Sequence, residues 1–209
     1  MLRKVPKQLH RKSLLRAVRL LAAQDPSLSA IVSTFGPPPL WEREPGFHTL
    51  IHIILEQQVS LASARAAFNR LVAAAQPLTP ESFMKLTDTE LKGIGFSRQK
   101  TLYGRHLAEA IGQGDLDLTK LNLLDDAEAK SQLMRIKGIG SWTADIYLLM
   151  AMGRPDIWPT GDLALAVAVE RVKKMPRRPS PQELGELSRK WRPWRGVAAR
   201  ILWHFYLSH

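Results

Sequence analysis

Repeated helix-start signals limit what this chain can fold into. In a capping box, a serine or threonine and a glutamate three residues later each accept a hydrogen bond from the other's backbone N–H. Ser180 and Glu183 have this spacing, as do Thr87 and Glu90, and Asp25 precedes a proline suited to the first helical position. No segment shows the alternation of apolar and polar residues typical of a strand. The sequence therefore predicts an all-α protein of about ten short helices.

Two proline-rich segments interrupt the helices. Residues 36–46 read GPPPLWEREPG and residues 173–181 read KKMPRRPSP. Neither can form a regular helix, because proline fixes φ and lacks the backbone N–H. We expect both to be surface connections. Before the first of them, Leu14, Val18 and Leu21 recur with helical spacing, which predicts a docked helix near the N-terminus.

The charge of the chain indicates a polyanionic partner. It has 30 lysines and arginines against 19 acidic residues, a net charge of +11, and 45% apolar residues, enough for a packed core. Nucleic acid fits best, and an anionic membrane surface is second. The absence of cysteine excludes disulfides, thiolate zinc sites, iron–sulfur clusters and a cysteine nucleophile. No apolar run reaches the ~18 residues of a membrane span, so we expect a cytoplasmic protein.

The segment Leu133–Met150 places Gly-Ile-Gly between two apolar runs. Gly138 and Gly140 permit positive φ angles and close backbone approach, and Ile139 between them can enter the core. Such a turn presents backbone N–H groups at the start of the next helix, where they bind a phosphate without reading a base. The alternative is a tight turn with no ligand. A second Gly-Ile-Gly at 93–95 and the net charge favour a DNA-binding hairpin.

The segment from Leu133 to Asp162 resembles the helix–hairpin–helix DNA glycosylases, in particular the 3-methyladenine DNA glycosylase II type. Three further stretches carry the resemblance: FHTLIHIILEQQVSLASARAAF at 47–68, LKGIGFSRQKTLYGRHLAEAI at 91–111 and WRPWRGVAARILWHFY at 191–206. The resemblance implies a two-lobed helical core without the N-terminal β domain of some longer members. The lobes would comprise residues 45–155, with the hairpin at 133–150, and residues 1–44 together with 156–209.

The resemblance implies that Asp162 is the catalytic carboxylate. It follows Pro-Thr-Gly and precedes the apolar run LALAVAVERV, where a helix would begin. Breaking a base–sugar bond builds positive charge on the sugar, which a fixed carboxylate stabilises, and the same group can activate water. The local sequence alone favours a helix N-cap, worth about 1 kcal/mol. The two roles are compatible.

Bifunctional relatives carry a lysine just after the hairpin, which forms a Schiff base with the sugar. Here Trp142 occupies that position, and Lys137 precedes the hairpin. The resemblance therefore implies a monofunctional hydrolase that leaves an intact abasic strand.

A glycosylase must rotate the target nucleotide out of the duplex and hold its base between aromatic faces. The resemblance assigns this base pocket to Trp142, Trp203, Phe47 and Ile146, and Ile146 stands where relatives often have an aromatic residue. A cationic alkylated purine gains about 0.5–2 kcal/mol from an indole face. Each of the two tryptophans could instead belong to the core.

Residues for DNA contact are predicted in the hairpin and in a second turn. The resemblance assigns this role to Gly138, Ile139, Gly140, Ser141, Thr143, Gln57, Gln58 and Ser60. Gln57 and Gln58 would fill the gap left by the everted base, or they are polar residues at a helix end. Glu56 stands where relatives often have a small residue. His48 and His52 have metal-ligand spacing, but no third ligand is visible.

Basic residues form three clusters, of which we expect only some members to contact phosphates. They are Arg3, Lys4, Lys7, Arg11, Lys12, Arg16 and Arg19; Arg171, Lys173, Lys174, Arg177 and Arg178; and Arg189, Lys190, Arg192 and Arg195. Such runs are more often solvated faces than binding sites.

No organic cofactor is expected. The resemblance allows a sodium or potassium ion on the backbone carbonyls of Met134, Ile136 and Gly138. The expected partner is double-stranded DNA carrying bases such as 3-methyladenine or 7-methylguanine, bound by a monomer in base excision repair. Two alternatives stay open: a non-catalytic helix–hairpin–helix DNA-binding module, and a glycosylase for other bases.

Overall fold

The computed structural model describes residues 8–208 of the chain. Within this range the regular structure consists of twelve α-helices and two 3-10 helices without a strand, which confirms the all-α prediction and exceeds the expected number of helices. No helix in this range is long and apolar enough to span a membrane. The chain forms two compact units. One contains the residues up to Glu42 and those from Leu148 onward, and the other is Arg43–Tyr147.

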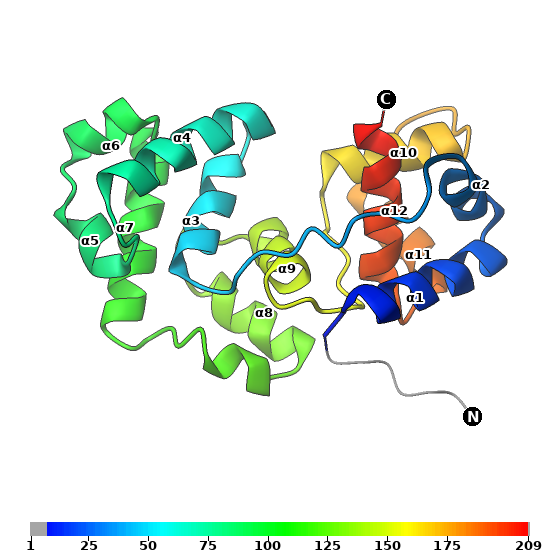
Figure 1. The fold of residues 1–209 in the computed structure, drawn as a ribbon, viewed down its shortest axis with the longest axis horizontal. Coiled ribbons are helices and arrows are strands. Elements are labelled where there is room, and N and C mark those ends of the chain that lie inside the picture. The colour runs from blue at the N-terminus through cyan, green and yellow to red at the C-terminus, as the bar shows by residue number, and fades with distance from the viewer. Residues whose placement is uncertain (1–7, 209) are drawn as a thin grey trace. The chain divides into compact units, whose positions relative to one another are not determined.

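The first unit is built around its last helix. Its helices are α1 (Arg11–Gln24), α2 (Pro26–Phe35), α10 (Leu163–Val172), α11 (Pro181–Ser188), the 3-10 helix η2 (Arg189–Trp191) and α12 (Arg195–Leu207). Helix α12 is buried over residues 196–203 and packs against α10, α2 and α1 (Figure 1). The predicted N-terminal helix is α1, and it buries Leu14, Val18 and Leu21. Arg3, Lys4 and Lys7 of the first basic cluster lie outside the described residues.

A buried arginine attaches the first proline-rich connection to this unit. The Arg200 guanidinium donates to three backbone carbonyls: Leu40 at 2.9 Å, Gly196 at 3.2 Å and Leu149 at 2.8 Å. Burial lowers its pKa to about 10. Because three carbonyls receive its N–H groups, the cation is solvated by backbone dipoles. The segment 36–46 has no helical structure, as predicted, and is bound by Arg200 at Leu40.

The predicted N-cap at Asp25 is confirmed, and its carboxylate also gathers an ion-pair cluster. Its Oδ1 accepts from the Ser27 backbone N–H at 3.0 Å, and its Oδ2 accepts from the Trp191 indole at 2.9 Å. The ammonium groups of Lys190 and Lys173 lie 2.8 and 3.4 Å from Oδ2. Burial by itself would raise the pKa of Asp25. The hydrogen bonds from Lys190 and Trp191 and the charge of Lys173 instead hold it well below its usual range.

Acid is expected to destabilise the first unit by protonating Asp25. Because its folded-state pKa lies below the unfolded value of about 3.9, its contribution to stability is full above that value and is lost as the pH falls further. Asp25→Asn keeps a cap acceptor but leaves two cations unpaired. We expect it to lower the free energy of unfolding by about 2–4 kcal/mol at pH 7, less than for a fully buried pair because Lys190 is half-exposed.

Urea unfolding between pH 2 and 7 measures this effect, with Asp115→Asn, an exposed aspartate of the other unit, as the control. The Asp25→Asn protein should show a flatter loss of stability in acid than the wild type. If the free energy of unfolding falls with pH equally steeply in the two proteins, protonation of Asp25 does not cause the loss of stability in acid.

The second unit contains the hairpin. Its helices are α3 (Phe47–Glu56), α4 (Leu61–Ala74), α5 (Pro80–Lys85), α6 (Asp88–Ile94), α7 (Arg98–Gly112), the 3-10 helix η1 (Lys120–Leu123), α8 (Asp126–Met134) and α9 (Ser141–Met150), whose last residues belong to the first unit. Helix α3 packs against α4 and α7, and α5 and α6 pack against α7. The apolar helix α3 therefore lies in the core of this unit.

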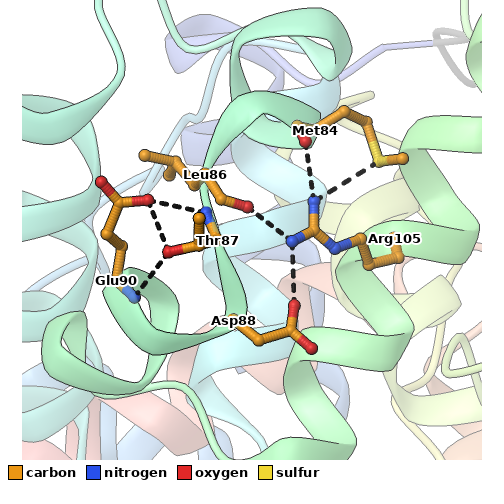
Figure 2. A network of polar contacts seen from close by, with 6 residues as sticks. All are labelled: Met84, Leu86, Thr87, Asp88, Glu90 and Arg105. Carbon is orange, nitrogen blue, oxygen red and sulfur yellow. Dashed lines mark hydrogen bonds and ion pairs between the residues drawn. The ribbon is translucent and has the colours of Figure 1, made fainter.

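Helix α7 organises the short helices beside it, as Figure 2 shows. Arg105 donates to the backbone carbonyls of Met84 and Leu86 and pairs with Asp88 at 2.9 Å. The capping box of Thr87 and Glu90 is present, as the sequence predicted. One arginine thus joins the end of α5 and the start of α6 to α7.

Candidate active site

Asp162 stands at the start of α10 with 8% of its surface exposed. Its Oδ1 accepts two hydrogen bonds, from the Leu165 backbone N–H at 2.9 Å and from the Trp203 indole N–H at 3.1 Å. The N-cap interpretation is therefore confirmed. The indole bond is a second support, which a cap does not require. Together they fix the orientation of the carboxylate, as electrostatic stabilisation of a developing cation demands.

Trp203 is buried within α12 and donates a hydrogen bond to Asp162, which lies 41 residues earlier in the sequence. The sequence left a pocket role and a core role open for this tryptophan. The structure gives it a specific bond that neither alternative included. No sequence signal could have revealed this bond, because helices α10 and α12 meet only through tertiary packing.

The hairpin joins α8 to α9 through residues 135–140. Gly138 has a φ of +98°, and a Cβ added to it would lie 2.2 Å from Cγ of Tyr103 on α7. Only glycine fits here, since both the backbone angle and the neighbouring ring exclude a side chain. Ile139 is buried, as predicted, and its N–H donates to the Ile136 carbonyl at 3.0 Å. The candidate phosphate-binding N–H groups are therefore those that follow Ile139.

An ion pair braces the two helices of the hairpin. Lys130 of α8 lies 2.7 Å from Oδ1 of Asp145 on α9, and Asp145 is almost fully buried. The Ser141 hydroxyl lies 3.5 Å from the other oxygen of the same carboxylate. The side chain of Ser141, which the sequence assigned to DNA contact, therefore also faces the brace.

The two Gly-Ile-Gly copies differ in their positions relative to the helices. In the first, Gly93 lies inside α6 and Gly95, with a φ of +117°, ends that helix in the left-handed conformation. In the second, Gly138 lies in the loop and the Gly140 carbonyl accepts the first hydrogen bond of α9. Both segments are helix–turn–helix, as predicted, but only the second has its glycine pair between the helices.

Gln57, at the end of α3, binds the hairpin directly. Its Nε2 donates to the Gly138 carbonyl at 3.0 Å and to the Thr143 hydroxyl at 2.9 Å. Thr143 is only 2% exposed. Its side chain, assigned to DNA contact by the sequence, is thus engaged inside the protein. Only its backbone N–H remains a candidate for DNA.

A family model matches residues 51–193, and its description is HhH-GPD superfamily base excision DNA repair protein. The chain belongs to the HhH-GPD superfamily. A curated relative, DNA-3-methyladenine glycosylase 1 of Schizosaccharomyces pombe, is 28% identical over 84% of this chain and 79% of its own length. A solved S. pombe 3-methyladenine DNA glycosylase in complex with abasic DNA superposes with a TM-score of 0.84 at 27% identity, covering 90% of this chain and 95% of that one.

Two relatives from Bacillus subtilis are longer than this chain, which spans 64% and 56% of their lengths. The second of them, a DNA-3-methyladenine glycosylase, is 28% identical over 75% of this chain. The HhH-GPD assignment confirms the recognition made on the sequence motifs, and the predicted helical core is the fold of the superposed glycosylase.

The turn between α3 and α4 is the second HhH-GPD element predicted to contact DNA. Gln58 is exposed and has a φ of +58°, the left-handed conformation. Val59 beside it is 46% exposed. Ser60 is the N-cap of α4, with its hydroxyl 3.2 Å from the Ser63 N–H. The turn therefore presents one polar and one apolar side chain outward, while Ser60 has a structural task of its own.

The residues predicted for the base pocket differ in their surroundings. Phe47 packs edge-on against Phe83 with ring centroids 5.7 Å apart, a contact typical of a core. Ile146 is buried, and Trp142 in the first turn of α9 is half-buried. Tyr147, next to Ile146, accepts a hydrogen bond from the Gly46 N–H at 3.0 Å, and burial raises its pKa to about 12. Their contact with a base stays a prediction.

Glu56, the unusual acid before the exposed turn, is neutralised by an arginine. Arg43 binds both of its carboxylate oxygens, at 2.8 and 3.1 Å. His52 lies 3.6 Å from Oε1 of Glu56 and stacks on Phe68 at 4.2 Å, and burial lowers the pKa of His52. No group of three His, Cys, Asp or Glu side chains able to hold a metal occurs among residues 8–208. His48 and His52 therefore have no third ligand of these types within this range.

The carbonyls predicted for a monovalent cation are partly engaged. The Gly138 carbonyl accepts from Gln57, and the Ile136 carbonyl accepts from the Ile139 N–H. Each carbonyl oxygen has a second lone pair, so the donor set remains compatible with sodium or potassium. A cation that includes the Met134 carbonyl stays a prediction.

Most members of the second and third basic clusters pair with acids of the first unit. Lys173 and Lys190 bind Asp25. Further pairs are Arg177–Glu183, Arg178–Glu170, Arg192–Asp156 and Arg195–Asp156. In contrast, Arg11, Lys12, Arg16 and Arg19 on α1 are exposed and form no ion pair with an acid in the described range. Six of the nine residues in the second and third clusters therefore pair with acids of their own unit.

Proposed function

We propose that this protein is a monofunctional DNA glycosylase that releases alkylated purines of the 3-methyladenine and 7-methylguanine type from double-stranded DNA. Its HhH-GPD membership and its 3-methyladenine glycosylase relatives support this reaction class. The observation that carries the proposal is the Asp162 carboxylate, held by the Trp203 indole at the start of α10. In a module that only binds DNA, this carboxylate would serve only as the cap of α10.

The reaction breaks the C1′–N bond of the damaged nucleotide. The electron pair leaves with the base, which departs neutral because alkylation had made it cationic, so no strong general acid is needed. Positive charge grows on the sugar, and the oriented Asp162 carboxylate stabilises it. Water then adds to C1′, and its proton passes to the carboxylate or to solvent. The products are the free base and an abasic site.

The hairpin would hold the DNA strand during this reaction. The N–H groups at the start of α9 lie where the helix dipole favours an anion, and Gly140 is exposed there. Contacts of this kind grip phosphates without reading bases. The turn at Gln58 and Val59 would occupy the space that the target nucleotide leaves when it is everted. Eversion itself costs a few kcal/mol.

Incubation with methylated duplex DNA tests the proposal. We expect free alkylated purines in the supernatant, and strand breaks only after hot alkali, because abasic sites are alkali-labile. Borohydride should trap no covalent complex, since Trp142 stands where a lyase carries its lysine. A reaction without base release would instead favour the non-catalytic DNA-binding module, and release from a panel of other lesions would favour a different base specificity.

A further inference from the structure

We propose that Gln57 is a positioning residue that fixes the exposed turn of Gln58 and Val59 to the hairpin, so that both engage DNA as one rigid body. The proposal rests on the function above and assigns Gln57 a role different from the gap-filling predicted by the sequence. All of its contacts lie within the second unit.

The end of α3 is clamped at three successive residues. The Leu55 carbonyl accepts from the Lys100 ammonium at 2.7 Å. The carboxylate of the next residue, Glu56, is bound by both terminal nitrogens of Arg43. Gln57 then reaches the hairpin. Each bond comes from a different part of the unit, so the last turn of α3 has little freedom to move.

The amide of Gln57 has no donor left for DNA. Its Nε2 carries two hydrogens, and the Gly138 carbonyl and the Thr143 hydroxyl receive them at 3.0 and 2.9 Å. A flipped amide would place its oxygen against the Gly138 carbonyl, which can only accept. The orientation of the amide is therefore determined by its partners.

Immediately after Gln57, whose side chain is bound to the hairpin, the chain becomes exposed. Gln58 adopts the left-handed conformation, which is unfavourable for a non-glycine residue and persists where the surroundings impose it. Val59 and Leu61 are 46% and 59% exposed. The residues that can enter DNA are thus held at a set distance from the hairpin through one side chain.

A double-mutant cycle of Gln57→Ala and Thr143→Ala tests this role, with Gln113→Ala, an exposed glutamine on the same unit, as the control. Binding to a duplex with a tetrahydrofuran abasic analogue beside 2-aminopurine gives the readout, because 2-aminopurine fluorescence rises when the stack is opened. Because Gln57 forms two side-chain hydrogen bonds, their removal should lower the amount of opened complex roughly tenfold to a hundredfold. Affinity for undamaged duplex should fall less than threefold, and Gln113→Ala should change neither.

Thr143 decides between positioning and direct contact, because its side chain is almost fully buried and is engaged by Gln57. We expect Thr143→Ala to weaken opening and the double variant to be little worse than Gln57→Ala alone. Gln58→Ala should also weaken opening, and Thr143→Ala should have a smaller effect in that background, because one of the positioned side chains is then missing. Thr143→Ser, which keeps the hydroxyl, should retain the wild-type response.

The proposal would be overturned if Thr143→Ala left opening unchanged. It would also be overturned if the effects of Gln57→Ala and Thr143→Ala on opening were additive in the double variant. A thermal midpoint that falls in step with the fluorescence across all variants would also overturn it, since that pattern indicates a structural role only. The assay needs no base release. A wild-type protein that opens the duplex but frees no alkylated purine would therefore refute the proposed function. The double-mutant cycle would still test the role of Gln57.

Discussion

The Asp162→Asn protein is expected to fold and to bind DNA as the wild type does, yet to release alkylated purines slower by a factor on the order of 10² or more. Asparagine keeps an acceptor oxygen for the Leu165 N–H and the Trp203 indole. The cap and the tryptophan bond can therefore persist. What disappears is the negative charge that opposes the cation growing on the sugar.

Single-turnover release of 7-methylguanine measures this effect, with Asp115→Asn as a surface control and binding to an abasic duplex as the test of integrity. Trp203→Phe is a second, milder variant. It keeps a smaller aromatic ring but removes the N–H that orients Asp162, so a loss of about tenfold is expected, the equivalent of one hydrogen bond. Wild-type release by the Asp162→Asn protein would remove Asp162 from the mechanism.

The Gly138→Ala protein is expected to lose most of its stability or its DNA binding. The added methyl group would lie 2.2 Å from Cγ and 2.5 Å from Cβ of Tyr103, and the φ of +98° is unfavourable for alanine. Overpacking costs about 1–3 kcal/mol, and the backbone strain adds of order 1–3 kcal/mol. The carbonyl that Gln57 binds belongs to the same residue, so any relaxation also displaces the hairpin.

Gly140→Ala provides the matched control two residues away. A Cβ there meets nothing within 4 Å, and its φ lies outside the left-handed region. Its thermal midpoint should stay near that of the wild type. Replacing Tyr103 by alanine in the Gly138→Ala background removes the ring but keeps Cβ, so it should recover only part of the steric loss. Equal thermal midpoints for Gly138→Ala and Gly140→Ala would contradict the prediction, because they would show that the hairpin accepts a side chain at position 138.

The limits of sequence reasoning are clearest in the glutamines and tryptophans. The motif EQQVS marked a turn with two polar residues, and that turn is present, but the sequence could not distinguish Gln57 from Gln58. The structure does so because one side chain meets Gly138 and the other is exposed. Likewise, a motif could mark Trp203 but not its bond to Asp162, since two helices must pack before an indole and a carboxylate meet.

Local signals determined the helical class, the caps at Asp25 and Ser180, the glycine break at 138–140 and the place of Asp162 before a helix. These depend on residues a few positions apart, whose backbone preferences act within one turn. Only the tertiary structure decided which lysines and arginines pair with acids, which glutamine holds the hairpin and what orients the carboxylate. Such contacts join distant segments, and no local preference encodes which side chains meet when the chain packs.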